Sequence, residues 1–270
     1  MTITFIGGGN MATAMIGGLL KKGWPAETII VVDIDAGARA RLSRELHIKV
    51  VPQLDALSAV ADCIVLAVKP QQLRETARLL YPFLGSQLVL SIAAGIRLGD
   101  LSTWLGSYQK IVRVMPNTPA LELAGISGLC ATPAVSGEDR ARAEKVMRAV
   151  GTTLWVEREE QMDAITAISG SGPAYVFYFI ESLQQAAIDL GFPAPDAERL
   201  ALATFEGAVK LVHASTEDAA TLRARVTSKG GTTERAIEVM ETDGVRRAIL
   251  RAVRSAAQRS RELGEQLGGG

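Results

Sequence analysis

The sequence is poor in the side chains that most catalytic and metal sites use. Its 270 residues include only two cysteines and two histidines, and 5% of them are aromatic. No histidines or cysteines have the spacing of a zinc site, and no motif of a catalytic triad is present. Cys63 and Cys130 both lie in strand-like runs, so we interpret them as buried structural thiols. His47 and His213 lie at the ends of predicted helices and are expected to be surface or capping residues. We therefore expect no metal site.

Excess charge and long apolar runs are also missing. The chain has 29 Lys and Arg against 29 Asp and Glu, so no long-range field would attract nucleic acid or a membrane surface. No basic segment precedes an apolar run at the N-terminus, so no signal peptide is expected. The longest apolar stretch of the second half, residues 173–180, stops at Glu181, whereas a membrane span needs about 20 residues. We expect a cytoplasmic enzyme without nucleic-acid or membrane partners.

Strand and helix patterns alternate in the first half of the chain. The run at 62–68 is apolar almost throughout, as in a strand covered on both faces. This alternation predicts an α/β fold, a Rossmann-type, doubly wound and mostly parallel sheet over residues 1–158. The predicted strands are 2–6, 28–33, 48–51, 62–68, 87–92, 110–114, 126–131 and 153–157.

The second half, residues 159–270, reads as an all-helical domain. Pro173 and Pro195 are suited to helix starts and Gly191 to a helix end. The helix at 173–190 begins with residues that are apolar on every side, which predicts burial all round. A domain of this size can scarcely cover such a helix alone, so we predict an intertwined homodimer. The terminal Gly268–Gly270 is expected to fray. The predicted helices are 161–168, 173–190, 195–214, 218–226, 231–242 and 244–266.

A glycine-rich turn joins the first predicted strand to the first helix. Gly7 allows the tight turn, Gly9 lets the backbone approach a pyrophosphate, and Ala12 lets the helix pack closely on the strand. The free N–H groups at the helix start favour phosphates. We therefore predict a dinucleotide site. Its first set of residues is Gly7, Gly8, Gly9, Asn10, Met11 and Ala12.

The second predicted strand leaves the choice of cofactor open. Asp33, at its end, is placed to bond the adenine ribose and repel a 2′-phosphate, which favours NADH. Arg39 and Arg41 follow closely and could bind a 2′-phosphate, although both also suit a solvated helix face. The predicted cofactor is therefore NADPH or NADH.

Three later strands end in small or proline-bearing segments at the same predicted edge of the sheet. Ligands of open α/β sheets bind at this edge. Lys69 is the one titratable candidate there, and we interpret it as structural. Asn117 follows the sixth strand as a polar group able to face a substrate. The further cofactor-binding residues predicted here are Ala67, Val68, Lys69, Pro70, Ala93, Ala94 and Gly95.

A loop in the helical half combines hydroxyl groups with glycines before a predicted helix. Ser228 is followed by Gly230, Gly231, Thr232 and Thr233. Free N–H groups at a helix start, together with hydroxyls, can bind a carboxylate without a lysine or arginine. The same pattern also suits an ordinary capped helix after a glycine turn.

Six segments in register resemble the pyrroline-5-carboxylate reductase family. They are FIGGGNMA (5–12), AVKPQ (67–71), SIAAG (91–95), VRVMPNTPA (112–120), SGSGPAY (169–175) and VTSKGGTT (226–233). The resemblance implies NAD(P)H-dependent reduction of L-1-pyrroline-5-carboxylate to L-proline, the last step of proline biosynthesis. It also implies dimers that can form larger rings, such as decamers.

The resemblance assigns roles to the loop at 228–233. Ser228, Gly231 and Thr232 would hold the substrate carboxylate with Gly230 beside them, and Thr233 would hydrogen-bond the ring nitrogen and serve in catalysis. Lys229 departs from the family, which usually has proline there. It either strengthens anion binding or points to water.

The lack of an obvious general acid fits the reduction of an imine, which can bind already protonated. Catalysis then depends on positioning and on preorganised polar groups. Two alternatives remain. Another imine or β-hydroxyacid dehydrogenase would normally carry a Lys or Asp acid on the first helix of the second domain, where this chain has Ser171, Pro173, Tyr175 and Tyr178. A dinucleotide-binding sensor would bind the cofactor without chemistry.

Overall fold

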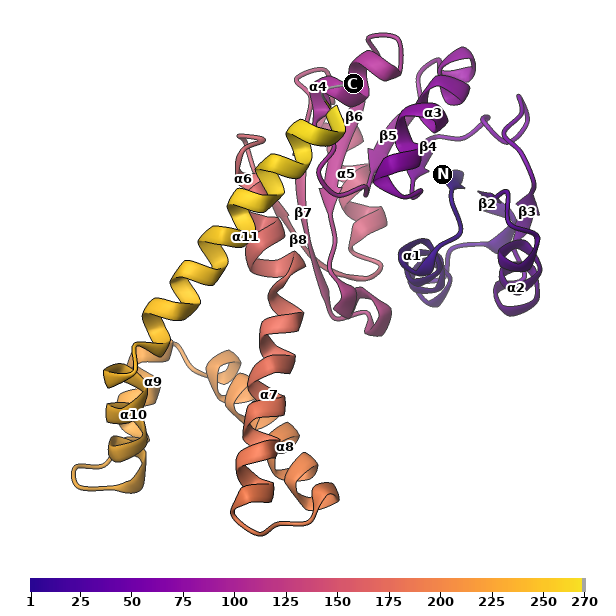
Figure 1. The fold of residues 1–270 in the computed structure, drawn as a ribbon. Helices are drawn as coiled ribbons and strands as arrows, with labels where there is room; N and C mark the ends of the chain where they lie inside the picture. The colour runs from indigo at the N-terminus through magenta and orange to yellow at the C-terminus, as the bar shows by residue number, and fades with distance from the viewer. Residues whose placement is uncertain (269–270) are drawn as a thin grey trace. The chain divides into compact units, whose positions relative to one another are not determined.

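An eight-stranded sheet forms the centre of the N-terminal half (Figure 1). The computed structural model describes residues 1–268. The strand order is β3-β2-β1-β4-β5-β6-β7-β8, and its first six strands have the order of a dinucleotide-binding Rossmann fold. The predicted fold class is confirmed. The strands are β1 (Ile3–Ile6), β2 (Ile29–Val32), β3 (Lys49–Val51), β4 (Cys63–Leu66), β5 (Leu88–Ser91), β6 (Ile111–Met115), β7 (Gly125–Ala131) and β8 (Gly151–Trp155).

The sheet is parallel except at one junction. β7 pairs antiparallel with β6, and β8 pairs parallel with β7. The central strands β1, β4 and β5 are buried at every position, which explains their continuous apolar sequence. Each predicted strand is present with its ends shifted by no more than two residues.

Helices cover both faces of the sheet and form two apolar clusters. One cluster places α1, α2 and α5 against one face, and the other places α3, α4, Met162 of α6 and Leu267 of α11 against the opposite face. The helices of this half are α1 (Asn10–Lys21), α2 (Ala36–Leu46), α3 (Pro70–Leu80), α4 (Leu98–Trp104), α5 (Gly137–Met147) and α6 (Gln161–Ile165), and a π-helical turn, Thr166–Gly170, follows α6.

The rest of the described chain is helical, as predicted. Pro173 and Pro195 lie at the second positions of α7 and α8, and Gly191 ends the α7 region with a positive φ of 97°. Gly268 is the last residue of α11, so the prediction that it frays is wrong, and Gly269 and Gly270 lie outside the described residues. These helices are α7 (Gly172–Asp189), α8 (Ala194–Ala214), α9 (Ala219–Arg225), α10 (Thr232–Thr242) and α11 (Val245–Gly268).

The chain divides into two compact units. The first combines Met1–Ser171 with the described residues from Ala256 onward, and the second is Gly172–Ser255. One continuous helix, α11, therefore contributes to both units. The domain boundary after residue 158 stays a prediction.

The second unit exposes a large apolar surface in the single chain. α7 and α8 pack against each other, yet no residue of α7 is buried. Phe177 and Tyr178 are 64% and 69% exposed. The sequence predicts that α7 is buried on all sides, but a single chain does not bury it.

The two thiols are structural, as the sequence predicts. Cys63 and Cys130 are buried and unbridged, and burial raises the pKa of both, which keeps them protonated. Within residues 1–268, no helix combines the length and apolar character needed to cross a bilayer. The same residues contain no group of three or more His, Cys, Asp or Glu side chains suited to a metal ion.

Neighbouring glycines of α1 test how closely this helix packs. A Cβ at Gly18 would collide with the carbonyl oxygen of Ala149, whereas a Cβ at Gly17 would meet open space. We expect Gly18→Ala to lower the free energy of unfolding by about 1–3 kcal/mol. Gly17→Ala should raise it by roughly 0.5–1 kcal/mol because alanine favours the helix. Thermal melts of the two variants measure the difference, and equal shifts would contradict the close packing of α1.

Candidate functional site

Six parallel strands, β1 to β6, run toward one edge of the sheet. Their register aligns Ile6 of β1 with Val32 and Leu66, and it aligns Ser91 of β5 with both Leu66 and Arg113. The backbone ladder continues into the loops, because the N–H of Gly7 donates to Val32 and that of Ala67 donates to Ile6, each over 2.8 Å. The segments after β1, β4 and β5, which the sequence assigns to the cofactor, therefore leave the sheet side by side.

The glycine-rich turn after β1 lies against the backbone of the segment that follows β4. Gly7 has φ +102°, and a Cβ there would lie 2.7 Å from the carbonyl carbon of Ala67. Only glycine meets both conditions. Gly9 is different, because a Cβ at this position would meet no atom within 4 Å. Gly9 precedes α1 as its N-cap and offers no side-chain cap, so the first N–H groups of the helix are left for a ligand.

Asp33 holds the turn from the end of β2. One carboxylate oxygen accepts a hydrogen bond from the N–H of Gly8 over 2.6 Å, and the other accepts one from Asp35 over 2.8 Å. These two hydrogen bonds explain why an acid lies at the end of β2, and no ribose contact is needed to explain it. The ribose contact of Asp33 stays a prediction.

Two of the three arginines of α2, Arg39 and Arg41, donate hydrogen bonds to the backbone near the glycine-rich turn. Arg39 donates to the carbonyl oxygens of Asp33 and Ile34, and Arg41 donates to the carbonyl oxygen of Gly8 over 3.3 Å. Neither guanidinium lies on a remote solvated face. A contact of either arginine with a 2′-phosphate stays a prediction.

A cavity of about 500 Å³ lies at this edge. The glycine turn, Asp33 and the segment after β4 line it, including the exposed Lys69. Open space in front of Gly9 and bare N–H groups at α1 suit a pyrophosphate, so the residues fit a dinucleotide. Residues lining the cavity that the sequence also assigns to the cofactor are Gly7, Gly8, Gly9, Asp33, Ala67, Val68 and Lys69. Asn10, Met11 and Ala12 form the first turn of α1, and Pro70 begins α3.

The loop after β5 joins the same edge but not the cavity lining. Ala93 and Gly95 are buried, Ala94 is exposed, and Gly95 has φ +80°. The sequence did not predict the acid that fixes the far end of this loop. A carboxylate oxygen of Glu159 accepts from the N–H of Leu98, at the start of α4, over 2.7 Å and from Arg113 over 2.9 Å. An arginine inside the apolar strand 111–115 was the one available signal, because a buried charge needs a partner.

Asn117 makes hydrogen bonds within the chain that the sequence did not predict. Its side chain is 8% exposed, its oxygen accepts from the N–H of Ile126 over 2.9 Å, and its amide nitrogen donates to the carbonyl oxygen of Ser169 over 3.2 Å. Both the oxygen and the nitrogen of the amide therefore have a backbone partner within the chain. It ties the end of β6 to β7 and to the π-helical turn, and substrate contact by Asn117 stays a prediction.

The predicted carboxylate site lies in the second unit, where α10 begins. Gly231 is the N-cap and Gly230 has φ +74°. The N–H of Gly230 donates to a carboxylate oxygen of Glu234 over 2.6 Å, and that of Gly231 donates to Ser228 over 3.0 Å. The site is less bare than predicted, because an acid three residues into the helix reaches back, much as in a capping box. The backbone N–H groups of Thr232 and Thr233 lie in the first turn, where no intrahelical partner exists.

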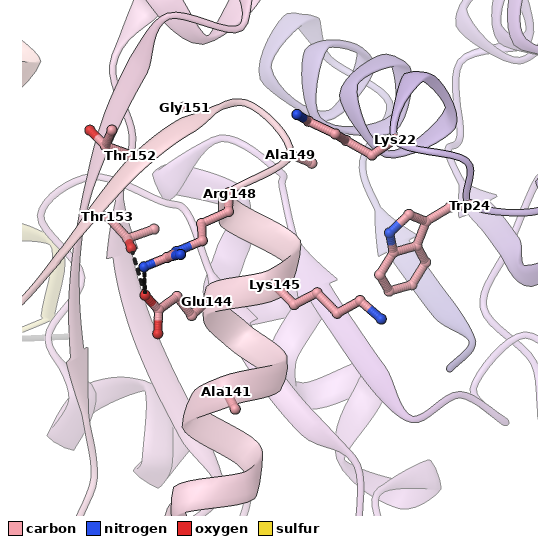
Figure 2. A pocket seen from close by; sticks show the side chains of 10 residues that line it. All are labelled: Lys22, Trp24, Ala141, Glu144, Lys145, Arg148, Ala149, Gly151, Thr152 and Thr153. Atoms are coloured by element: carbon pink, nitrogen blue, oxygen red, sulfur yellow. Dashed lines mark hydrogen bonds and ion pairs between the residues drawn. The ribbon is translucent and has the colours of Figure 1, made fainter.

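A larger cavity, about 930 Å³, lies elsewhere in the first unit (Figure 2). Its charges are largely satisfied from within. Arg148 pairs with Glu144 over 2.7 Å, and the Lys145 ammonium lies 5.0 Å from the centre of the Trp24 ring. None of the predicted site residues lines this cavity. Size alone therefore does not identify the site, and the smaller cavity at the strand ends is the candidate.

Comparisons with known proteins agree with this geometry. The family model described as pyrroline-5-carboxylate reductase dimerisation matches residues 159–263, and the model described as NADP oxidoreductase coenzyme F420-dependent matches residues 2–95. Pyrroline-5-carboxylate reductase of Pseudomonas aeruginosa is 45% identical over 98% of both chains. A solved structure of the Coxiella burnetii enzyme has a TM-score of 0.91 at 39% identity, covering 97% of this chain and 98% of the other.

The chain belongs to the pyrroline-5-carboxylate reductase family. It is therefore an oxidoreductase that uses NAD(P)H, and it carries the family's dimerisation region. A pyrroline carboxylate reductase of Plasmodium falciparum with NADP bound has a TM-score of 0.87 at 30% identity and covers 98% of each chain. The family predicted from the six segments is confirmed.

Substituting Gly7 and Gly9 of the glycine-rich turn separates the effect on folding from the effect on cofactor binding. We expect Gly9→Ala to leave the melting temperature unchanged, because its Cβ meets no protein atom, and to weaken NAD(P)H binding about tenfold or more by occupying space for the pyrophosphate. Gly7→Ala should lower both stability and affinity. Fluorescence titration and thermal melts measure these effects. An unchanged NAD(P)H affinity of Gly9→Ala would place the phosphates elsewhere.

Proposed function

We propose that the chain catalyses the NAD(P)H-dependent reduction of L-1-pyrroline-5-carboxylate to L-proline, the last step of proline biosynthesis. Family membership supports the reaction. Two structural observations carry the residue assignments. The chain has a glycine-lined cavity at the ends of β1 and β4. In its second unit it has a helix start with hydroxyls and free amides. The first suits the cofactor, and the second suits a small carboxylate.

The residues of the α10 start would orient the substrate. Ser228, Gly230, Gly231 and Thr232 would surround its carboxylate, and the Thr233 hydroxyl would hydrogen-bond the ring nitrogen. When bound, the dihydronicotinamide supplies a hydride for the imine carbon. Because the imine nitrogen enters protonated, no general acid is needed, and these residues act by positioning and by holding charge. The Glu234 carboxylate holds Gly230, and Lys229 is exposed beside it.

The hydroxyl of Thr233 gives a direct test of this arrangement. We expect Thr233→Ala to lower kcat/KM for pyrroline-5-carboxylate by about tenfold or more, with the Kd for NAD(P)H unchanged. Thr233→Ser, which keeps the hydroxyl, should retain most of the activity. Absorbance at the nicotinamide band measures the rate.

Two outcomes would reject the assignment. If Thr233→Ala stayed within about twofold of the wild type, the hydroxyl would contribute under about 0.5 kcal/mol and would have no catalytic role. If pyrroline-2-carboxylate were reduced faster than pyrroline-5-carboxylate, the chain would act on another imine. Michaelis constants for NADPH and NADH, measured in the same assay, decide the cofactor preference.

We also propose that the chain forms a cytoplasmic homodimer through its helical half. The apolar face of α7, with Phe177 and Tyr178 mostly exposed, is more apolar surface than a monomer usually leaves in water. The α10 start of one protomer would then serve the cofactor edge of its partner. Assembly of dimers into a decamer rests on the resemblance to the family.

Light scattering at micromolar concentration tests the dimer. We expect the mass of two chains or a multiple of it, because burying α7 removes its aromatic side chains from water. Phe177→Glu should dissociate the assembly, because it would bury an unpaired charge. Leu79→Glu, an exposed site on α3, is the matched control and should leave the mass unchanged. A stable wild-type monomer would refute the proposal.

A further inference from the structure

The last three turns of α11 belong to the first compact unit rather than to the helical one. Residues 256–268 of α11 (Figure 1) group with Met1–Ser171. Leu267 packs against the apolar cluster that includes residues of α3, α4 and β5. This segment, the α11 end (residues 256–268), contacts the loop between β5 and α4 (residues 92–97). This loop contains Ala93, Ala94 and Gly95, which the sequence assigns to the cofactor.

Glycine makes the contact between helix and loop close. A Cβ at Gly264 would lie 3.0 Å from the carbonyl oxygen of Gly95 and 3.4 Å from Nε of Arg97. A Cβ at Gly95 would in turn lie 3.3 Å from Leu267. One turn further, a Cβ at Gly268 would collide with the carboxylate of Asp100 in α4. Glycines four residues apart therefore present a bare helix face to this loop and to α4.

A buried polar contact fixes the same helix from another direction. The hydroxyl of Ser260 donates to a carboxylate oxygen of Asp163 in α6 over 2.6 Å, and both residues are buried. On the surface, Arg97 of the loop and Glu265 of the helix form an ion pair of 3.7 Å. The α11 end is thus anchored to α6 and to the loop within one unit.

The loop is held by its buried side chains Ala93 and Ile96, which lie in the apolar cluster, and by three further contacts. β5 fixes its start in register with β4, Glu159 accepts the N–H of Leu98 at its far end, and Gly264 contacts Gly95 at its middle. The first two contacts restrain only the ends. Gly95 has a left-handed backbone conformation, and the three atoms nearest to a Cβ built there all belong to the α11 end.

We propose that the α11 end is a positioning element for the cofactor. Gly264 and Ser260 set the height of Gly95 and its neighbours at the sheet edge, and the nicotinamide end of NAD(P)H binds against that loop. These residues touch neither substrate nor cofactor and act through the loop. The inference rests on the proposed cofactor contact of Ala93–Gly95.

Gly264→Ala tests the proposal in the full chain. The added Cβ must displace the loop by a few tenths of an ångström, so we expect the Kd for NAD(P)H to rise about fivefold and kcat to fall about tenfold. The primary isotope effect with 4-deuterated cofactor should increase, because misplacement slows hydride transfer, whereas simple loss of folded enzyme would not change it. Gly137→Ala, at an open and exposed helix start, is the matched control and should match the wild type.

Three further variants keep the proposal testable if Gly264→Ala folds poorly. Leu267→Ala removes the side chain nearest Gly95 and should weaken NAD(P)H binding in the same direction. Ser260→Ala should also do so, and Ser260→Thr, which keeps the hydroxyl, should restore it. Unchanged NAD(P)H affinity, kcat and isotope effect in folded Gly264→Ala, or in folded Leu267→Ala, would overturn the proposal. Failure of the wild type to reduce pyrroline-5-carboxylate would instead refute the proposed substrate, since cofactor binding is measured without it.

Discussion

The backbone ladder among the parallel strands is the constraint on which the cofactor site depends. Because β1, β4 and β5 pair in register, their last residues form one row at a single edge, and the parallel neighbour β6 ends two residues further on. Short segments far apart in the sequence then meet without any direct bond between their side chains. The ladder also brings Gly7 so close to Ala67 that a side chain on Gly7 would overlap the backbone. The spacing of the strands therefore requires glycine at position 7. Because glycine has no side chain, it leaves room for the cavity.

Several charged side chains near this edge of the sheet are hydrogen-bonded to the backbone or paired with one another. Asp33 and the arginines of α2 bond to the backbone around the glycine turn, so the turn keeps its shape. Glu159 does the same at the loop after β5 while neutralising Arg113 inside the sheet. Such charge-assisted bonds are shorter and stronger than neutral ones. They give a scaffold that needs few titratable groups facing a ligand, which suits the reduction of an imine that is already protonated.

Periodicity and turn chemistry predicted the elements well. Apolar runs located all eight strands, and proline and glycine located the ends of α7 and α8. Contacts between distant segments were not predictable in the same way. Asn117 looked like a free amide, but its partners are backbone groups of Ile126 and Ser169. Gly268 was expected to fray, but it ends α11 and lies against Asp100 of α4. Gly264, for which the sequence predicted no contact, lies against Gly95. The local sequence pattern does not show which segment packs against the face of α11 that carries these glycines.

The exposed helices of the second unit and the buried sheet of the first have different requirements. The central strands β1, β4 and β5 are buried within one chain, whereas α7 leaves aromatic side chains in water, consistent with the family's dimerisation region. Hydrogen–deuterium exchange with and without NAD(P)H tests the central claim that the strand ends form one cofactor site. Protection of residues 7–12, 67–70 and 93–95 together is the expected result. Protection confined to the cavity around Lys22 and Trp24, with these three segments unchanged, would contradict it.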